Sequence, residues 1–81
     1  MAKENLINVI FISIEEDIYL STSCQKEEQF ASIEKLFYKE YPELIELDIS
    51  YKCNGEKIKS VKSIEDNKIK NNDIVIIIIN E

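Results

Sequence analysis

The residues of this sequence that could do chemistry are two cysteines and two clusters of acids. A catalytic thiol needs a base beside it, usually a histidine, and the 81 residues contain no histidine. Cys24 and Cys53 are also too few to hold a zinc ion or an iron–sulfur cluster by themselves. We therefore predict that neither thiol is a nucleophile or a metal ligand.

The acidic clusters lie at residues 15–17 and 27–28. We expect the first in a turn and the second at the start of a helix, where water surrounds them, whereas catalytic acids need burial or charged partners that tune their pKa. One glycine is too few for a phosphate-binding loop, and no calcium-loop spacing of oxygen ligands is present. The sequence thus predicts that the chain is not an enzyme and has no catalytic, cofactor-binding or metal-binding residues.

The charge balance narrows the classes of partner. The net charge is −6 and all ten basic residues are lysines, which argues against nucleic-acid binding and slightly favours a basic partner surface or simple solubility. The longest apolar run, residues 74–79, is much shorter than the roughly 20 residues of a membrane span. No secretory signal precedes the first apolar segment, so we expect an intracellular protein, cytoplasmic or nuclear, with two reduced thiols, although one disulfide stays possible.

The elements that carry these residues begin with a predicted β-hairpin. Residues 6–14 and 18–23 are rich in β-branched and aromatic side chains and are separated by the acids at 15–17. A three-residue turn there would give the hairpin one apolar core side. The residues expected on that side are Ile10, Ile12, Ile14, Ile18 and Leu20. Phe11 and Tyr19 would then share the opposite, outer face.

A helix is predicted next. Apolar residues recur at helical spacing and form a stripe that faces a core. The residues of this stripe are Phe30, Ile33, Phe37 and Tyr41, with Leu36 beside them. The polar residues 26–29 suit a first helical turn, and Pro42 ends the helix because the residue before a proline disfavours the helical conformation.

The second half of the chain predicts a second hairpin and a central strand. Residues 48–53 alternate as a strand, Asn54-Gly55 is a strong hairpin-turn signal, and residues 56–61 continue as a short strand. The loop 63–69 is expected to turn Ile64 and Ile69 inward. Residues 74–79 are apolar at every position, which is typical of a strand covered on both faces. The order predicts an α+β fold in which a mixed sheet packs on one helix.

Three segments of this second half resemble ubiquitin and the ubiquitin-like domains. They are residues 51–58 (YKCNGEKI), 63–69 (SIEDNKI) and 73–77 (DIVII), which align without a gap, while the first half is similar by pattern only. The resemblance implies a ubiquitin-like β-grasp fold, with a five-stranded mixed sheet in the order 2-1-5-3-4. It covers roughly residues 6–80, and since 81 residues are enough for one domain at most, we expect a single ubiquitin-like domain over residues 1–81.

Two departures from that family bear on function. The conjugated members end in a Gly-Gly pair, whereas the single glycine here is Gly55, so conjugation is not expected. By the resemblance, Lys52 occupies the place of the central isoleucine of ubiquitin's recognition patch, Ile78 that of its valine and Ile76 that of its histidine. We expect generic ubiquitin receptors to bind poorly, because a lysine would have to be desolvated in an apolar socket.

The favoured function is therefore a non-conjugatable protein-interaction module that is monomeric in isolation. Alternate residues of 74–79 must point away from the core, and exposed apolar residues that cluster mark interfaces. The predicted protein-binding residues are Phe11, Tyr19, Lys52, Ile76 and Ile78. Two alternatives stay open: the chain is a structural subunit fixed in a large multiprotein assembly, or the β-branched residues are present for strand propensity alone.

Overall fold

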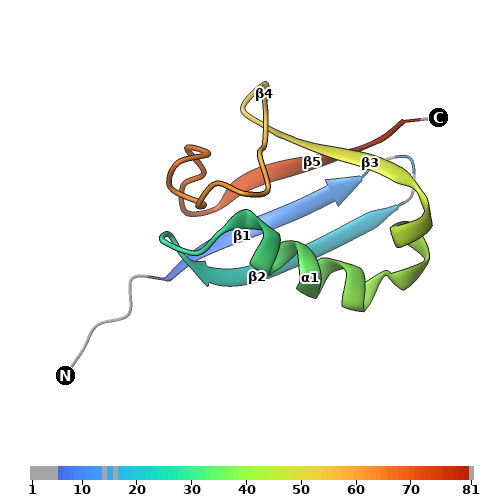
Figure 1. Cartoon of the computed structure of the whole chain (residues 1–81), viewed down its shortest axis with the longest axis horizontal. Coiled ribbons are helices and arrows are strands. Elements are labelled where there is room, and N and C mark those ends of the chain that lie inside the picture. Colours follow the sequence, from blue (N-terminus) through green and yellow to red (C-terminus); the bar gives the residue numbers. More distant parts are fainter. Residues whose placement is uncertain (1–5, 14, 16, 81) are drawn as a thin grey trace.

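The computed structural model describes residues 6–13, 15 and 17–80. The elements in chain order are β1 (Leu6–Ser13), β2 (Ile18–Gln25), α1 (Phe30–Glu40), the 3-10 helix η1 (Pro42–Glu46), β3 (Asp48–Cys53), β4 (Glu56–Lys57) and β5 (Asp73–Asn80). The sheet order is β2-β1-β5-β3-β4, with β1 and β5 parallel and the other neighbours antiparallel (Figure 1). The predicted strand order and the predicted α+β fold are confirmed.

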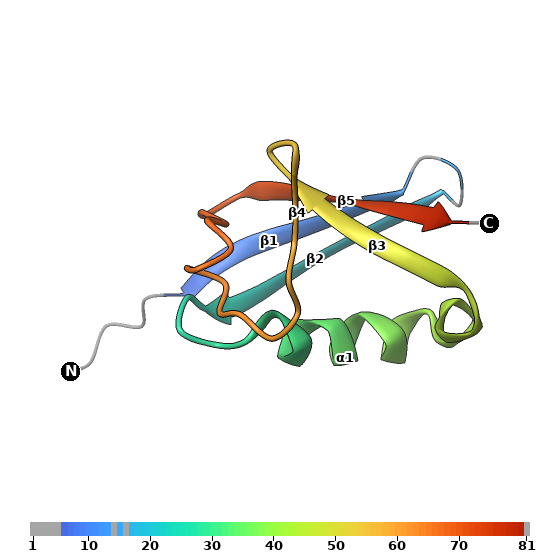
Figure 2. The same cartoon turned by 45° about the horizontal axis from the view of Figure 1, so that its top comes forward.

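The helix α1 covers one face of the sheet (Figure 2). Between them lies an aromatic core in which Phe11 of β1 stacks on Phe37 of α1, with ring centres 5.1 Å apart. Phe30 and Tyr51 meet edge to face at 5.1 Å. Close aromatic pairs of this kind add to the free energy gained from burial alone. Because α1 lies on one side only, the other side of the sheet, here named the outer face, is left without a covering element among the described residues.

The facing of β1 differs from the prediction. Val9, Phe11 and Ser13 are buried against α1, and Ile10 and Ile12 lie on the outer face. Four residues, not three, separate the paired residues Ser13 and Ile18, and a one-residue shift exchanges the two faces of one strand. Both faces of β1 are apolar, so alternation did not decide between them. The ring of Phe11 stacks on that of Phe37, which places this side chain in the core. Ile14 lies outside the described residues.

The facing of β2 agrees with the prediction. Ile18 is buried, and Leu20 is half-buried and packs against the core, while Tyr19 lies on the outer face. In the helix, Phe30, Ile33 and Phe37 are buried and Tyr41 is half-buried, as its stripe predicts. The stripe does not include Leu36, which is exposed.

Two predicted ends are wrong for one shared reason. The helix α1 begins at Phe30 instead of near residue 26, and β4 ends at Lys57 instead of near residue 61. The amides of Phe30 and Ala31 donate to the carbonyls of Lys62 and Ser60, at 2.9 and 3.0 Å. These carbonyls satisfy the first amides of the helix in place of a side-chain cap. The chain after β4 therefore leaves the sheet and runs to the start of α1 (Figure 2).

The segment after β4 closes one end of the core. Ile64 and Ile69 are buried there, as predicted. The side chain of Asn67 holds the segment in shape: its Oδ1 accepts the amide of Lys59 at 2.9 Å, and its Nδ2 donates to the carbonyls of Lys59 and Ser63 at 2.9 and 3.0 Å. Within the described part of the chain, no helix has the length and apolar character to cross a membrane.

Candidate functional site: the outer face of the sheet

One straight row of side chains crosses all five strands on the outer face. Cross-strand pairing places Tyr19 opposite Ile12, Ile12 beside Ile76, Ile76 opposite Lys52, and Lys52 opposite Lys57. Neighbouring strands lie about 4.8 Å apart, so the row is roughly 19 Å long. Its first half is apolar and its second half is basic.

The apolar half widens into a patch. Tyr19 is 64% exposed, Ile76 51% and Ile74 46%. The half-buried Ile10, Ile12 and Ile78 fill the space between them. Here the patch is named the outer-face patch, and its residues are Ile10, Ile12, Tyr19, Ile74, Ile76 and Ile78. Large apolar side chains that are contiguous and exposed are uncommon on monomeric proteins and mark binding surfaces more often than isolated ones do.

Two hydrogen bonds made by side chains lie at the border of the patch. The hydroxyl of Tyr41 donates to the carbonyl oxygen of Tyr19 at 3.4 Å, which ties the edge strand to the end of α1. Toward the start of β1 the patch gives way to polar groups, where Ser21 Oγ and Asn8 Oδ1 are 2.8 Å apart. The patch is thus an apolar area that has a polar border toward the start of β1.

Four of the five predicted binding residues lie on this face, namely Tyr19, Lys52, Ile76 and Ile78. Phe11 does not, because it is fully buried in the core. Its predicted place is taken by Ile10 and Ile12, which were assigned to the core. The size of the Phe11 side chain is the signal that could have reversed this assignment, since the strand position above the middle of a helix favours the larger residue. Whether the four residues bind a partner stays a prediction.

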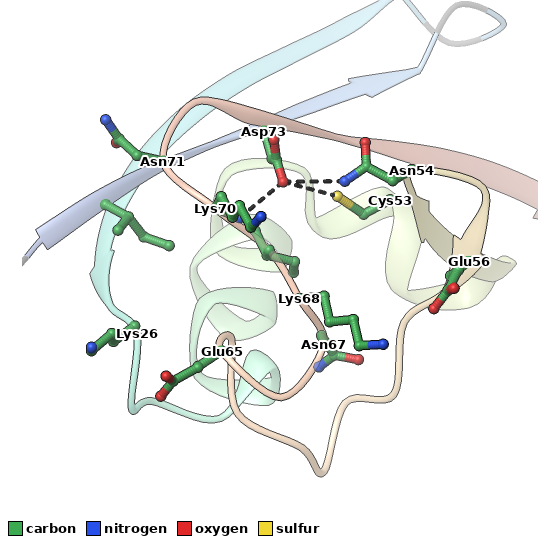
Figure 3. Close-up of a pocket in the computed structure, with 12 residues that line it drawn as sticks. Lys26, Cys53, Asn54, Glu56, Glu65, Asn67, Lys68, Lys70, Asn71 and Asp73 are labelled. Carbon is green, nitrogen blue, oxygen red and sulfur yellow. Dashed lines mark hydrogen bonds between the residues drawn. The ribbon is translucent and has the colours of Figure 1, made fainter.

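A second feature is an open pocket of about 660 Å³ at one end of the sheet. It lies between the start of β1, the β3–β4 turn and the segment before β5 (Figure 3). Asp73 Oδ2 accepts from the amide of Lys70 at 2.9 Å and from Asn54 Nδ2 at 3.3 Å, and Cys53 Sγ lies 3.8 Å away. This carboxylate joins the turn to the segment that precedes β5, so its role is structural.

Three lysines and three acids line the pocket and give it no net charge that would select a ligand. They are Lys26, Lys68, Lys70, Glu56, Glu65 and Asp73.

The two cysteines are separate, free and buried. Cys24 lies in β2 and Cys53 in β3, and these two strands are roughly 14 Å apart across the sheet, which is too far for a disulfide. Burial, with Glu28 nearby, raises the pKa of Cys24 to about 11. Burial, with the Asp73 carboxylate beside the thiol, raises the pKa of Cys53 to about 11 as well. A thiol with so high a pKa is a poor nucleophile.

The thiols predict how stability depends on pH. Each thiol has a higher pKa in the folded chain than the value of 9.0 expected when unfolded, so the unfolded chain releases its protons first as the pH rises. The stabilisation is complete below pH 9 and is lost as the pH approaches 11. We expect the free energy of unfolding, measured by urea titration, to fall by on the order of 2 kcal/mol per thiol across this window. Cys24→Ala should make the fall shallower, and an equally steep fall in that variant would contradict the assignment.

Comparison with known proteins agrees with this architecture. No protein-family model and no curated protein sequence matches the chain. Among solved structures, the ubiquitin-like domain of Arabidopsis thaliana protein At2g32350 superposes with a TM-score of 0.80 at 10% identity, covering 100% of this chain and 84% of that one. The UBL domain of Plasmodium falciparum Dsk2 superposes with a TM-score of 0.76 at 12% identity, covering 93% and 99%.

A de novo designed protein based on ubiquitin also superposes, with a TM-score of 0.78 at 9% identity, covering 94% of this chain and 90% of the design. At identities this low, the superpositions carry information about the fold and not about binding residues. Together with the strand order, the parallel central pair β1 and β5, and the single helix α1, the superpositions show that this chain has the ubiquitin-like β-grasp fold.

Proposed function

We propose that this chain is an intracellular, non-enzymatic module that binds a partner protein through the outer face of its sheet. The observation that carries the proposal is the contiguous patch around Ile12, Ile76 and Tyr19, on the side of the sheet that α1 leaves uncovered. Burying such a patch removes apolar surface from water at about 25 cal/mol per Å². The binding proposed is non-covalent, since the 81 residues contain one glycine, Gly55 in a hairpin turn, and therefore no Gly-Gly pair of the kind that conjugated ubiquitin-like proteins use.

The buried thiols support a binding role over a catalytic one. Cys24 and Cys53 are the strongest nucleophile candidates by residue type, and both have raised pKa values. Activated thiols have lowered pKa values and partial exposure. Two free thiols held three strands apart also suit a reducing compartment.

Site-specific photo-crosslinking tests the proposal. A benzophenone amino acid is placed at Tyr19 on the outer face, or at Leu36, which is 48% exposed on α1, in cells that produce the protein. We expect a discrete crosslinked partner from position 19 and none from position 36. The added change Ile76→Ser should remove that crosslink, because a hydroxyl at the centre of the patch must be desolvated on binding.

Ile45→Ser is the matched control, since Ile45 is 65% exposed in η1 and lies outside the patch. It should leave the crosslink from position 19 unchanged. Crosslinks from position 36 alone, or a crosslink from position 19 that survives Ile76→Ser, would refute the outer face as the binding surface.

A further inference from the structure

We infer that the partner presents acidic side chains beside an apolar segment, so that its carboxylates meet Lys52 and Lys57 while its apolar groups cover the outer-face patch. This inference rests on the proposed function and specifies the chemistry of the partner. It concerns the basic half of the row, which begins directly beside Ile76.

Lys52 and Lys57 form an unfavourable pair in the isolated chain. They lie directly opposite each other on β3 and β4, and like charges directly opposite across two strands destabilise a sheet. Neither lysine makes a salt bridge with an acid within the described ranges. Both side chains are exposed. An anionic group placed between them would relieve the repulsion. The described part of the chain places no such group there, so a partner with carboxylates would complement the charge of this pair.

The position of the pair is unusual in so acidic a protein. The net charge of −6 by itself favours a basic partner surface, but the charge on the row has the opposite sign. At about 0.1 M salt the Debye length is about 10 Å, which exceeds the strand spacing of about 4.8 Å that separates the two lysines. A partner bound along the row therefore experiences these two lysines more strongly than the acids on distant faces.

The same charge balance favours a protein segment over a membrane. An anionic lipid surface is extended, so it would meet the negative field of the whole chain as well as the two lysines. A short segment can meet the lysines alone. The row also has the right form for a segment, since roughly 10 Å of apolar surface is followed, one strand further on, by two lysines on strands about 5 Å apart. Carboxylates are expected about two strand spacings from the apolar anchor that covers Ile12.

Selection from a random linear-peptide phage library tests the inference, because the library samples acidic, basic and apolar segments alike. The immobilised targets are the wild-type chain and the double variant Lys52→Glu/Lys57→Glu. This variant keeps a like-charged pair across the two strands, so its stability should match that of the wild type. The control is Lys35→Glu/Lys39→Glu on the exposed side of α1, which lowers the net charge by the same amount.

Wild-type ligands should combine apolar residues with an excess of Asp and Glu. Their affinity should fall at least about tenfold for Lys52→Glu/Lys57→Glu, a change of about 1.4 kcal/mol, and stay within about twofold for Lys35→Glu/Lys39→Glu, which is a small change in free energy. Peptides selected on the outer-face double variant should carry Lys or Arg instead. Raising salt from about 0.1 to about 1 M should weaken wild-type binding, because the Debye length falls to about 3 Å.

The variant Ile76→Ser separates the inference from the proposed function. If Ile76→Ser abolishes peptide binding but the lysine reversal does not change it, or if the ligands show no acidic excess, the inference is overturned and the binding surface stands. If peptides bind Ile76→Ser as tightly as the wild type, the proposed function fails, and the inference fails with it. If no peptide is selected, or if phosphatidylserine vesicles bind the wild type and not the lysine reversal, the peptide-like partner is refuted.

Discussion

Phe11→Ala is expected to lower the free energy of unfolding by about 3–5 kcal/mol, the range measured for large aromatic side chains removed from protein cores. Phe11 is fully buried and its ring contacts three others, those of Phe30, Phe37 and Tyr51, at centre distances of 5.9, 5.1 and 6.0 Å. Removing it leaves a cavity in the middle of a small core. A chain of 81 residues has a total stability of about 4–12 kcal/mol, so the variant should lose a large fraction of its stability.

Ile12→Ala is the matched comparison, because the neighbouring residue lies on the outer face. We expect it to cost less than about 1 kcal/mol, as is usual for surface substitutions. Urea unfolding followed by circular dichroism measures both values. A larger loss for Ile12→Ala than for Phe11→Ala would mean that β1 faces the other way and would restore Phe11 to the binding surface.

Asn67→Ala should be the most damaging polar substitution, at about 2–3 kcal/mol, because each hydrogen bond lost contributes roughly 1 kcal/mol. The Asn67 side chain joins Lys59, Lys62 and Ser63 through one accepted and three donated hydrogen bonds. The substitution therefore loosens the whole turn. It also reaches α1, since carbonyls within that turn accept the first helical amides.

Hydrogen exchange locates this second effect. In Asn67→Ala, the amides of Phe30 and Ala31 should lose more protection from exchange than the fall in global stability explains. The protection of the β1 amides should fall only as much as the global stability does. Asn80→Ala is the control, since its side chain makes a single long contact of 3.4 Å with Ser50, and it should cost less than about 0.5 kcal/mol. Equal losses in the two asparagine variants would show that the turn does not depend on Asn67.

The second half of the fold could be predicted because local signals fix it. Asn54 and Gly55 both have positive φ, at 54° and 82°, as their hairpin turn requires. The uninterrupted apolar character of β5 predicts a central strand, and it lies between β1 and β3. Alternate residues of β5 face the core and the outer face as predicted, with Val75 and Ile77 buried and Ile74 and Ile76 exposed.

The facing of β1 could not be predicted because its sequence is apolar on both sides. Alternation with a period of two residues identifies the solvent-exposed face of a strand only where polar residues mark it, and residues 9–12 include no polar residue. The decision lies in the core, where ring packing with Phe37 selects Phe11. The helix start was missed for a different reason: its first amides are satisfied by a segment about 30 residues later in the chain, and a local pattern does not contain that information.

The candidate site was predicted in outline for the same reasons. Tyr19 belongs to a strand whose alternation fixes its facing, so it was placed correctly. Ile76 and Ile78 lie within residues 74–79, which are apolar at every position, and their outer placement came from the resemblance to the recognition patch of ubiquitin. The lysine pair was missed because Lys57 becomes the neighbour of Lys52 only through the hairpin register. That register follows from a two-residue turn at Asn54-Gly55, so pairing outward from the turn could have found it.

Backbone amide chemical shifts show whether the outer face is the surface that binds the partner. The partner captured by crosslinking is titrated into the isotope-labelled chain, and each amide is followed. We expect the largest shifts to cluster at Tyr19, Ile12, Ile76 and Lys52, with small shifts across α1. A sharp spectrum in which these four amides stay still, while those of α1 or of the pocket beside Asp73 move, would contradict this expectation.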